Sequence, residues 1–249
     1  MAVKITRVGN RCIVFSFDDI ADASPSNVLV ILGNKHVFVC DTFLGPGPMA
    51  QVADEIRKNH SNNPWIVFNS HADWDHHWGN CYFKNATIVS QESTRKAIEA
   101  TGERDLVTYK EFLRGDVKIV APNEVFLGQL RFPNEGIEFV HTPGHTLDSS
   151  SCIDLVDKVL YTGDNVELPI PYLTTPDLDT YIETLNDYLG LDIEHVVPGH
   201  GTIVASKRLI SENLDYLNAL KKGNVNASDS PRWRPIHEQN TRVLALYRH

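Results

Sequence analysis

Short runs of apolar residues alternate with polar or turn residues through much of the chain, which is the pattern of β-strands. In the first third the runs are rich in Val, Ile and Phe and read CIVFSF, NVLVILG and HVFVCDT, and PWIVFNSH and NATIVSQES follow further along the chain. Between residues 122 and 162 the alternation returns in EVFLGQLRF, GIEFVHT, SSCIDLV and KVLYTGD, and EHVVPGH gives a last core strand. We therefore expect strands in both halves of the chain.

Other segments carry apolar residues at helical spacing. PMAQVADEIRKNH has Pro48 at its front, where proline suits the first turn of a helix. TRKAIEATG is a helix that we expect Gly102 to end, and SKRLISENLDYLNALKKG is a helix that stops at Gly223. The remaining helices are DLDTYIETLNDYLGLD and, after the loop NVNASDSPRWRP, the short terminal segment HEQNTRVLALYRH.

The order of these elements is strands followed by helices, twice over. It favours an α/β protein in which two mixed β-sheets pack face to face with helices outside, a four-layer αββα sandwich, in a single domain over residues 1–249. Periodicity alone also fits other α/β arrangements. The residues at the ends of the predicted strands distinguish between these α/β arrangements.

Composition and charge narrow the classes of partner. With 249 residues and 42% hydrophobic content the chain can bury a core, and its net charge of −9 comes without a long basic run, which argues against nucleic acid. No apolar run approaches the ~18 residues of a membrane span, and the N-terminal sequence lacks the plan of a signal peptide. Cys12, Cys40, Cys81 and Cys152 form no CxxC pair. We therefore expect a cytoplasmic protein with reduced, mostly buried thiols and no membrane partner, with a homo-oligomer left open.

Side chains of metal-ligand type follow several of the predicted strands. Asp41 ends VFVCDT, and the other stretches are SHADWDHH (His71, Asp73, Asp75, His76), HTPGHT (His141, His145), YTGDN (Asp164) and VVPGHG (His200). Imidazole and carboxylate suit zinc, iron and manganese. In an extended loop His71, Asp73 and Asp75 would lie on one side, with His76 turned to the other side of the same centre. We expect His141, in contrast, to be a strand residue.

Two metal ions about 3.5–4 Å apart need a bridging group and roughly three further ligands each. The chain supplies seven candidates, four histidines and three aspartates. TPGH and VPGH present their histidines directly after Pro-Gly, where proline fixes φ and glycine permits a sharp turn that aims the imidazole. One such turn is weak evidence, but two of them in order with TGD and a His/Asp cluster indicate a metal site.

The ordered set Asp41, HxDxDH, TPGHT, TGD and VPGHG resembles the metallo-β-lactamase superfamily, from about Asn27 to Gly201. The resemblance implies an αββα sandwich with a dinuclear metal site at the edge between the sheets. Carried over by position, it implies His71, Asp73 and His145 for the first metal, Asp75, His76 and His200 for the second, and Asp164 as the bridge. Asp41 would support the site from behind the ligands, and His77 is expected there or on the surface rather than as a ligand.

Asp73 departs from the family pattern, which has histidine at this position. The flavodiiron proteins resemble this chain more closely here because they carry a glutamate and bind iron, although this chain has no room for their flavodoxin domain. Two divalent ions with three carboxylates and a bridging hydroxide make a neutral core, whereas histidine would leave a positive charge. A more anionic ligand set weakens the Lewis acidity of the metal and favours iron or manganese relative to zinc.

The surroundings of the cluster leave several alternatives open. Trp74 and Trp78 either line a substrate pocket or pack against the loop, and Glu167 either faces the site or does not. The pocket itself is expected from loops around residues 43–48, 102–116, 165–180 and 224–236.

The leading hypothesis is a metal-dependent hydrolase with two divalent ions, zinc or iron with manganese as an alternative, in which Asp75 and Asp164 are the catalytic carboxylates. A bridging hydroxide would attack a small ester, thioester, lactone, lactam or phosphoester. The alternative is a diiron protein that binds or reduces oxygen, as the carboxylate of Asp73 indicates. A binding protein with an inactive site is the third reading, and the intact ligand set argues against it.

Overall fold

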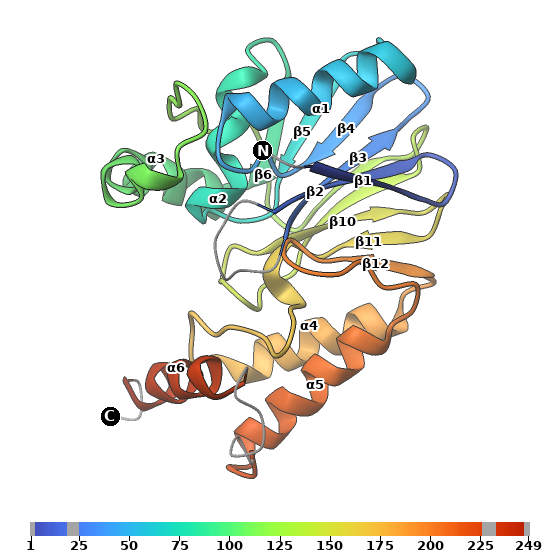
Figure 1. Ribbon diagram of the computed structural model, residues 1–249. Coiled ribbons are helices and arrows are strands. Elements are labelled where there is room, and N and C mark those ends of the chain that lie inside the picture. The colour runs from blue at the N-terminus through green and yellow to red at the C-terminus, as the bar shows by residue number, and fades with distance from the viewer. Residues whose placement is uncertain (1–2, 19–24, 226–232, 247–249) are drawn as a thin grey trace.

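A computed structural model describes residues 3–18, 25–225 and 233–246 of the chain. Two β-sheets pack face to face, and helices cover the outer face of each sheet (Figure 1). The predicted four-layer sandwich of two mixed sheets is thereby confirmed. Among the described residues, no helix has the length and apolar character needed to cross a membrane.

The first sheet has seven strands in sequential order. They are β1 (Val3–Val8), β2 (Cys12–Phe17), β3 (Ser26–Leu32), β4 (Val37–Cys40), β5 (Trp65–Asn69), β6 (Thr87–Gln91) and β7 (Glu124–Phe126). Strands β1 to β4 pair antiparallel, and β4 to β7 pair parallel. The outer face of this sheet carries α1 (Pro46–Asn59), α2 (Trp74–His77) and α3 (Glu92–Thr108).

The second sheet has five strands in the order β12, β11, β10, β9, β8. They are β8 (Gln129–Phe132), β9 (Ile137–His141), β10 (Ser150–Asp154), β11 (Val159–Tyr161) and β12 (His195–Val197). All neighbours pair antiparallel except β11 and β12. Helices α4 (Leu178–Gly190) and α5 (Arg208–Lys221) lie on its outer side, and α6 (Arg234–Leu246) lies beside them (Figure 1). Three short 3₁₀ helices complete the described elements: η1 (Trp78–Tyr82), η2 (Lys110–Phe112) and η3 (Gly163–Asn165).

Three apolar layers hold the sandwich together. Strand β3 shows why, because it is apolar on both faces: Leu29 and Ile31 point into the core between the sheets, and Val28 and Val30 pack under the helices. A second helix-side layer joins the five-stranded sheet to α4, α5 and α6. Near-continuous apolar runs of this kind are typical of strands that are covered on both sides.

The thiols follow the sequence prediction. All four cysteines are unpaired, and Cys12, Cys40 and Cys152 are buried between the two sheets. Burial raises the pKa of the Cys12 thiol.

Two carboxylates form hydrogen bonds between turns of one sheet and turns of the other. These turns follow β1 and β3 in the first sheet and β8 and β10 in the second. Glu135, in the β8–β9 turn, accepts hydrogen bonds from the backbone N–H groups of Asn34 (2.5 Å) and Lys35 (3.1 Å) and contacts Nδ1 of His36 (2.9 Å). Burial alone would raise the pKa of Glu135, but these contacts outweigh it and lower the pKa. Asp157 similarly accepts the backbone N–H groups of residues 10 and 11, both at 2.7 Å.

Several local predictions were wrong. Gly102 does not end a helix but lies inside α3, where a Cβ would come within 2.9 Å of Ile119, so close packing explains the glycine. EVFLGQLRF is not one strand, because β7 and β8 belong to different sheets. The strand at Val3–Val8 was not predicted, and α6 begins at Arg234, inside the segment expected to be a loop. Part of the expected 102–116 loop is helical, and residues 226–232 of the expected 224–236 loop lie outside the described residues.

Candidate metal centre

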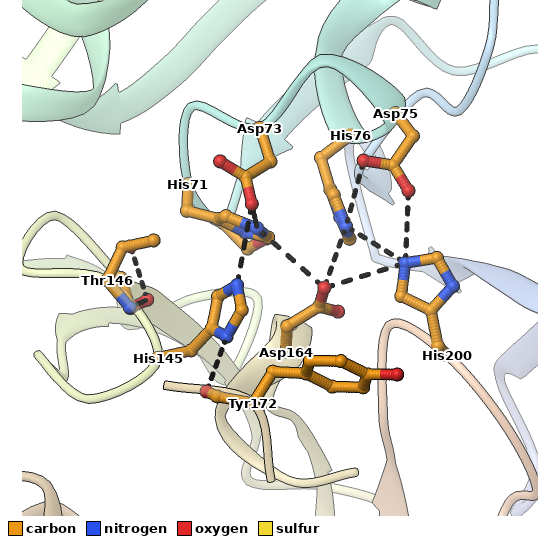
Figure 2. A network of polar contacts seen from close by, with 12 residues as sticks. His71, Asp73, Asp75, His76, His145, Thr146, Asp164, Tyr172 and His200 are labelled. Atoms are coloured by element: carbon orange, nitrogen blue, oxygen red, sulfur yellow. Dashed lines mark hydrogen bonds and ion pairs between the residues drawn. The ribbon is translucent and has the colours of Figure 1, made fainter. Parts of the chain in front are cut away.

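The predicted ligand side chains gather at one edge of the sandwich, although they come from four separate stretches (Figure 2). His71 and its neighbours follow β5, and His145 lies in the turn between β9 and β10. Asp164 follows β11, and His200 follows β12. The first group belongs to the seven-stranded sheet and the last three residues to the five-stranded sheet. Residues far apart in sequence therefore meet where the two sheets end side by side.

The first ligand group consists of His71, Asp73 and His145. Oδ2 of Asp73 lies 3.5 Å from Nε2 of His71 and 3.4 Å from Nε2 of His145. The three ligand atoms all lie within 4.8 Å of one another, which suits a shared ion. The side chain of Asp73 is 45% exposed, whereas that of His71 is 1% exposed, so Asp73 forms the open side of this group.

The second ligand group consists of Asp75, His76 and His200. Nε2 of His200 lies 3.1 Å from Oδ2 of Asp75 and 3.3 Å from Nε2 of His76. These ligand atoms too lie within 4.8 Å of one another. The expected extended loop is only partly present, because the backbone of Asp73 is extended but Asp75 and His76 sit in the helical turn α2. Successive helical positions, rather than strand alternation, aim these two side chains.

Asp164 lies between the two groups. Its Oδ2 is 3.9 Å from Nε2 of His71, 3.3 Å from Nε2 of His76 and 3.5 Å from Nε2 of His200. Nε2 of His71 and Oδ1 of Asp164 are buried and have no hydrogen-bond partner among the described residues. Because a buried polar atom without a partner is costly, these two atoms are suited to contact a bound cation. The donor set of imidazole and carboxylate fits two divalent metal ions.

Asp41 orients the second group from behind. It is 2% exposed, and its Oδ2 accepts hydrogen bonds from Nδ1 of His76 (2.7 Å), the Ser70 hydroxyl (2.6 Å) and the Tyr161 hydroxyl (2.8 Å). Its Oδ1 accepts the backbone N–H of Ser70 at 2.7 Å. A proton on Nδ1 of His76 leaves Nε2 free to bind a metal. The residue itself adopts a left-handed backbone conformation with φ of 59°, which follows the end of β4.

Each of the other three histidines also has a hydrogen-bonding partner at Nδ1. The Ser70 hydroxyl lies 2.9 Å from Nδ1 of His71, and the Ser26 hydroxyl lies 3.2 Å from Nδ1 of His200. Nδ1 of His145 faces the backbone carbonyl of Tyr172 at 3.0 Å. In all four residues Nε2 is the atom that faces the cluster.

Sequence reasoning missed most of these partners. Ser70 and Asn165, whose Oδ1 accepts the backbone N–H of His145 at 2.8 Å, stand next to motif residues and could have been considered for that reason. The sequence around Ser26 and Tyr172 does not indicate that either contacts a candidate ligand. A single serine or a backbone carbonyl occurs in every protein sequence.

Nearby carboxylates raise the pKa of His145 and of His200. Burial lowers the pKa of His145, but the hydrogen bond to Asp73 and the charges of Glu167 and Asp164 outweigh it and raise the pKa to about 10. Burial likewise lowers the pKa of His200, and the nearby aspartates raise it to about 9. The pKa of Asp164 is lowered: burial raises it, and the charges of His200 and His76 more than reverse this. A metal ion bound by these residues would therefore compete with protons for the imidazole nitrogens.

His77 and Glu167 are both buried, which selects between the alternatives left open by the sequence. His77 is not on the surface: it is 1% exposed, and neither ring nitrogen has a hydrogen-bond partner among the described residues. Burial lowers its pKa to about 4. Glu167 is 6% exposed and lies beside the cluster, where burial and then the charge of Asp164 raise its pKa to about 8. Its Oε2 accepts the backbone N–H of Tyr172 at 2.7 Å.

The two tryptophans next to the ligands differ in exposure. Trp78 is fully buried in the layer between the seven-stranded sheet and its helices. Trp74 is half-buried and stacks on Tyr109, with ring centroids 4.7 Å apart, and it contacts Phe112 in a tilted arrangement at 5.1 Å. Both tryptophans therefore pack against neighbouring side chains.

Two mixed sheets packed face to face, with histidines and aspartates gathered at their common edge, define a class of metallo-hydrolases. Residues 21–200 match the family model described as the metallo-β-lactamase superfamily. The chain belongs to this superfamily, as the sequence motifs predicted.

Curated relatives match parts of the chain. A probable metallo-hydrolase of Methanocaldococcus jannaschii is 25% identical over 195 residues, which cover 72% of this chain and 88% of that protein. The lactamase-like protein aptB of Emericella nidulans is 29% identical over 108 residues, 41% of this chain and 35% of the relative. A thioesterase of the same fungus, pkgB, is 30% identical over 99 residues, 40% of this chain and 28% of the relative. The match thus spans about a third of the length of these fungal proteins.

Solved structures of metallo-β-lactamases share the fold. DIM-1 metallo-β-lactamase superposes with a TM-score of 0.71 at 18% identity, covering 88% of this chain and 98% of that one. The metallo-β-lactamase of Pontibacter korlensis gives a TM-score of 0.68 at 19% identity, covering 87% of this chain and 99% of that one.

Proposed function

We propose that the chain is a hydrolase that uses two divalent metal ions. One ion would be held by His71, Asp73 and His145, the other by the group of Asp75, His76 and His200, and Asp164 would bind both. The observation that carries this proposal is the position of Asp164, whose Oδ2 lies within 3.9 Å of histidine nitrogens from both groups. Two buried ligand atoms without a hydrogen-bond partner support it as well.

The chemistry follows from the donor set. Bound metal ions would supply an acidified water and polarise a carbonyl or phosphoryl oxygen. Asp75 and Asp164 stay ionised, because burial raises the pKa of each carboxyl but the histidine charges outweigh it. They therefore act as ligands rather than as proton donors. The exposed edge of the cluster, at Asp73, is the side from which a substrate would approach.

We favour a small-molecule substrate with an ester, thioester, lactone, lactam or phosphoester group. One relative is named a thioesterase and another a metallo-hydrolase, which supports beginning with acyl esters and thioesters. The acidic composition, with a net charge of −9, supports the expectation that nucleic acid is not the substrate.

The test is turnover that depends on added metal. Protein stripped with a chelator is reloaded with zinc, iron or manganese, and metal content is measured alongside assays of generic substrates from each class. We expect two metals per chain and turnover of at least one class only after reloading. Protein that binds no metal on titration, or turnover that chelation leaves unchanged, would contradict the proposal.

Asp73 favours a second candidate, a diiron protein that binds or reduces oxygen. Its Oδ2 faces two histidine nitrogens at 3.4 and 3.5 Å, so the first group would hold a metal through two imidazoles and two carboxylates when Asp164 is included. This more anionic set suits iron. Metal analysis with a visible spectrum separates the candidates, since an oxidised diiron centre absorbs visible light and a zinc centre does not.

A further inference from the structure

The loop between η3 and α4 contacts the predicted metal ligand His145 at two points. The backbone carbonyl of Tyr172 accepts a hydrogen bond from Nδ1 of His145 at 3.0 Å (Figure 2). The hydroxyl of Thr174 donates to the backbone carbonyl of the same histidine. The ring and the backbone of His145 are therefore both fixed by a segment that carries none of the sequence motifs.

Asn240, on α6, holds this loop on both sides of Tyr172. Its Oδ1 accepts the backbone N–H of Leu173 at 2.9 Å, and its Nδ2 donates to the carbonyl of Pro171 at 2.8 Å. Nδ2 also donates to the hydroxyl of Tyr216 at 3.0 Å. The side chain of Asn240 is fully buried, and these three bonds use both its acceptor and its donors.

Asn213, on α5, forms a second clamp on the same loop. Its Oδ1 accepts the backbone N–H of Glu167 at 2.8 Å, and its Nδ2 donates to the carbonyl of Glu167 at 2.9 Å. The side chain of Glu167 then accepts the backbone N–H of Tyr172 at 2.7 Å. Asn213 is also fully buried. Two helices thus reach Tyr172 through two independent asparagines.

We infer that Asn240, assisted by Asn213, is a positioning residue for His145, so that the C-terminal helix α6 forms part of the metal site without touching it. An amphipathic helix can dock through apolar contacts alone. A buried side-chain amide, in contrast, destabilises the fold unless its hydrogen bonds are made. In this chain the amide of Asn213 makes both its hydrogen bonds to the backbone of one loop, and the amide of Asn240 makes two of its three there, the third going to the Tyr216 hydroxyl. That loop supplies the acceptor that sets the ring orientation of His145.

The inference rests on the proposed role of His145 as a ligand of the first metal, and its consequence is selective. Removing Asn240 frees the backbone of Pro171 and Leu173, so Tyr172 is then held only through Glu167 and its carbonyl is positioned less firmly. The first ligand group should weaken, while Asp41 continues to orient His76 in the second group. Loss of a partner behind a ligand typically costs 10–100-fold in metal affinity, and we expect about 10-fold for this indirect contact.

The experiment compares Asn240→Ala with Ile236→Ala, a matched control on the same helix. Ile236 is 6% exposed and packs in the apolar layer beneath α6, so its truncation weakens helix docking without removing a loop hydrogen bond. Cobalt is titrated into each metal-free protein and followed by visible absorption, and its release to a chelator is timed. Urea unfolding gives the stability of each variant. Asn213→Ala tests the same loop through the other clamp if Asn240→Ala does not fold.

We expect Asn240→Ala to bind one of two cobalt ions about 10-fold more weakly, with a changed absorption band, while the other ion is bound as in the parent. Ile236→Ala should lose stability yet keep both affinities. Equal weakening in both variants, or unchanged affinities in Asn240→Ala, would overturn the inference.

A readout without metal separates this inference from the proposed function. Nitrogen NMR of the metal-free protein reports the ring of His145 directly, and its Nδ1–H signal should shift in Asn240→Ala but not in Ile236→Ala. A parent protein that binds no metal would refute the proposed function alone. An unchanged Nδ1–H signal in Asn240→Ala would refute the positioning role alone.

Discussion

Replacing Asp41 by asparagine changes one atom, and the structure constrains what the new amide can do. With its NH₂ in place of Oδ2, the amide faces three donors, the hydroxyls of Ser70 and Tyr161 and Nδ1–H of His76. The two hydroxyls can rotate and accept. His76 can adapt only by moving its proton to Nε2, the atom that faces the cluster. With the amide flipped, its NH₂ meets the backbone N–H of Ser70, which cannot rotate away.

Either orientation carries a measurable cost. A buried donor left without an acceptor costs about 1–3 kcal/mol, so the free energy of unfolding of Asp41→Asn should fall by about this amount. Loss of the favoured His76 tautomer should weaken metal binding at the second group by about 10–100-fold. The assays are urea unfolding of the metal-free protein and a competitive metal titration.

Asp157→Asn is the matched control, since Asp157 is a buried carboxylate that accepts backbone N–H groups in the turn at residues 10 and 11. It should lose stability without losing metal affinity. Parent-like metal affinity in Asp41→Asn would refute the orienting role of Asp41, whatever happens to stability.

Three further tests, with four substitutions, address other parts of the structure. Asp164→Ala should reduce occupancy of both metals and nearly abolish turnover, whereas His77→Ala should affect metal binding much less; equal losses in a metal analysis would show that the ligands are misassigned. Asp73→His should shift competitive loading toward zinc, because a neutral, softer ligand replaces an anionic one; an unchanged zinc-to-iron ratio at full occupancy would mean that Asp73 is not a ligand. Glu135→Gln should destabilise the protein near neutral pH but progressively less on acidification, because the folded-state pKa of Glu135 is lowered and its contribution is lost as pH falls through that pKa; urea midpoints that differ equally at pH 7 and pH 4 would contradict this.

The gathering of the candidate ligand side chains could be predicted from sequence because metal chemistry favours particular residue types at particular positions. His145 and His200 each follow a Pro-Gly turn at the end of a strand, and no common packing role requires that pattern. The residues behind the ligands could not be predicted in the same way. Asn240 acts through backbone atoms of a loop nearly seventy residues earlier, and a polar position on a helix gives no sign of such a partner.

The fold was predicted at the level of layers but not of every strand or helix end. Gly102 satisfies the local rule for ending a helix, yet α3 continues because the glycine makes room for Ile119. The strand pair β7 and β8 reads as one apolar run, since the chain changes sheets within the two residues between Phe126 and Gln129. In both cases, contacts with distant parts of the chain determine where the element ends. The local sequence pattern does not show such contacts.

Each ligand group draws on both halves of the sandwich. His71 and Asp73 come from the seven-stranded sheet, while His145 and Asp164 come from the five-stranded sheet, and the second group divides in the same way. A folding intermediate with only one sheet formed would offer half of either coordination sphere. Tight metal uptake should therefore coincide with docking of the two sheets, and a bound ion would act as a cross-link that slows their separation. The rate at which a chelator strips the protein would then measure how often the sandwich opens.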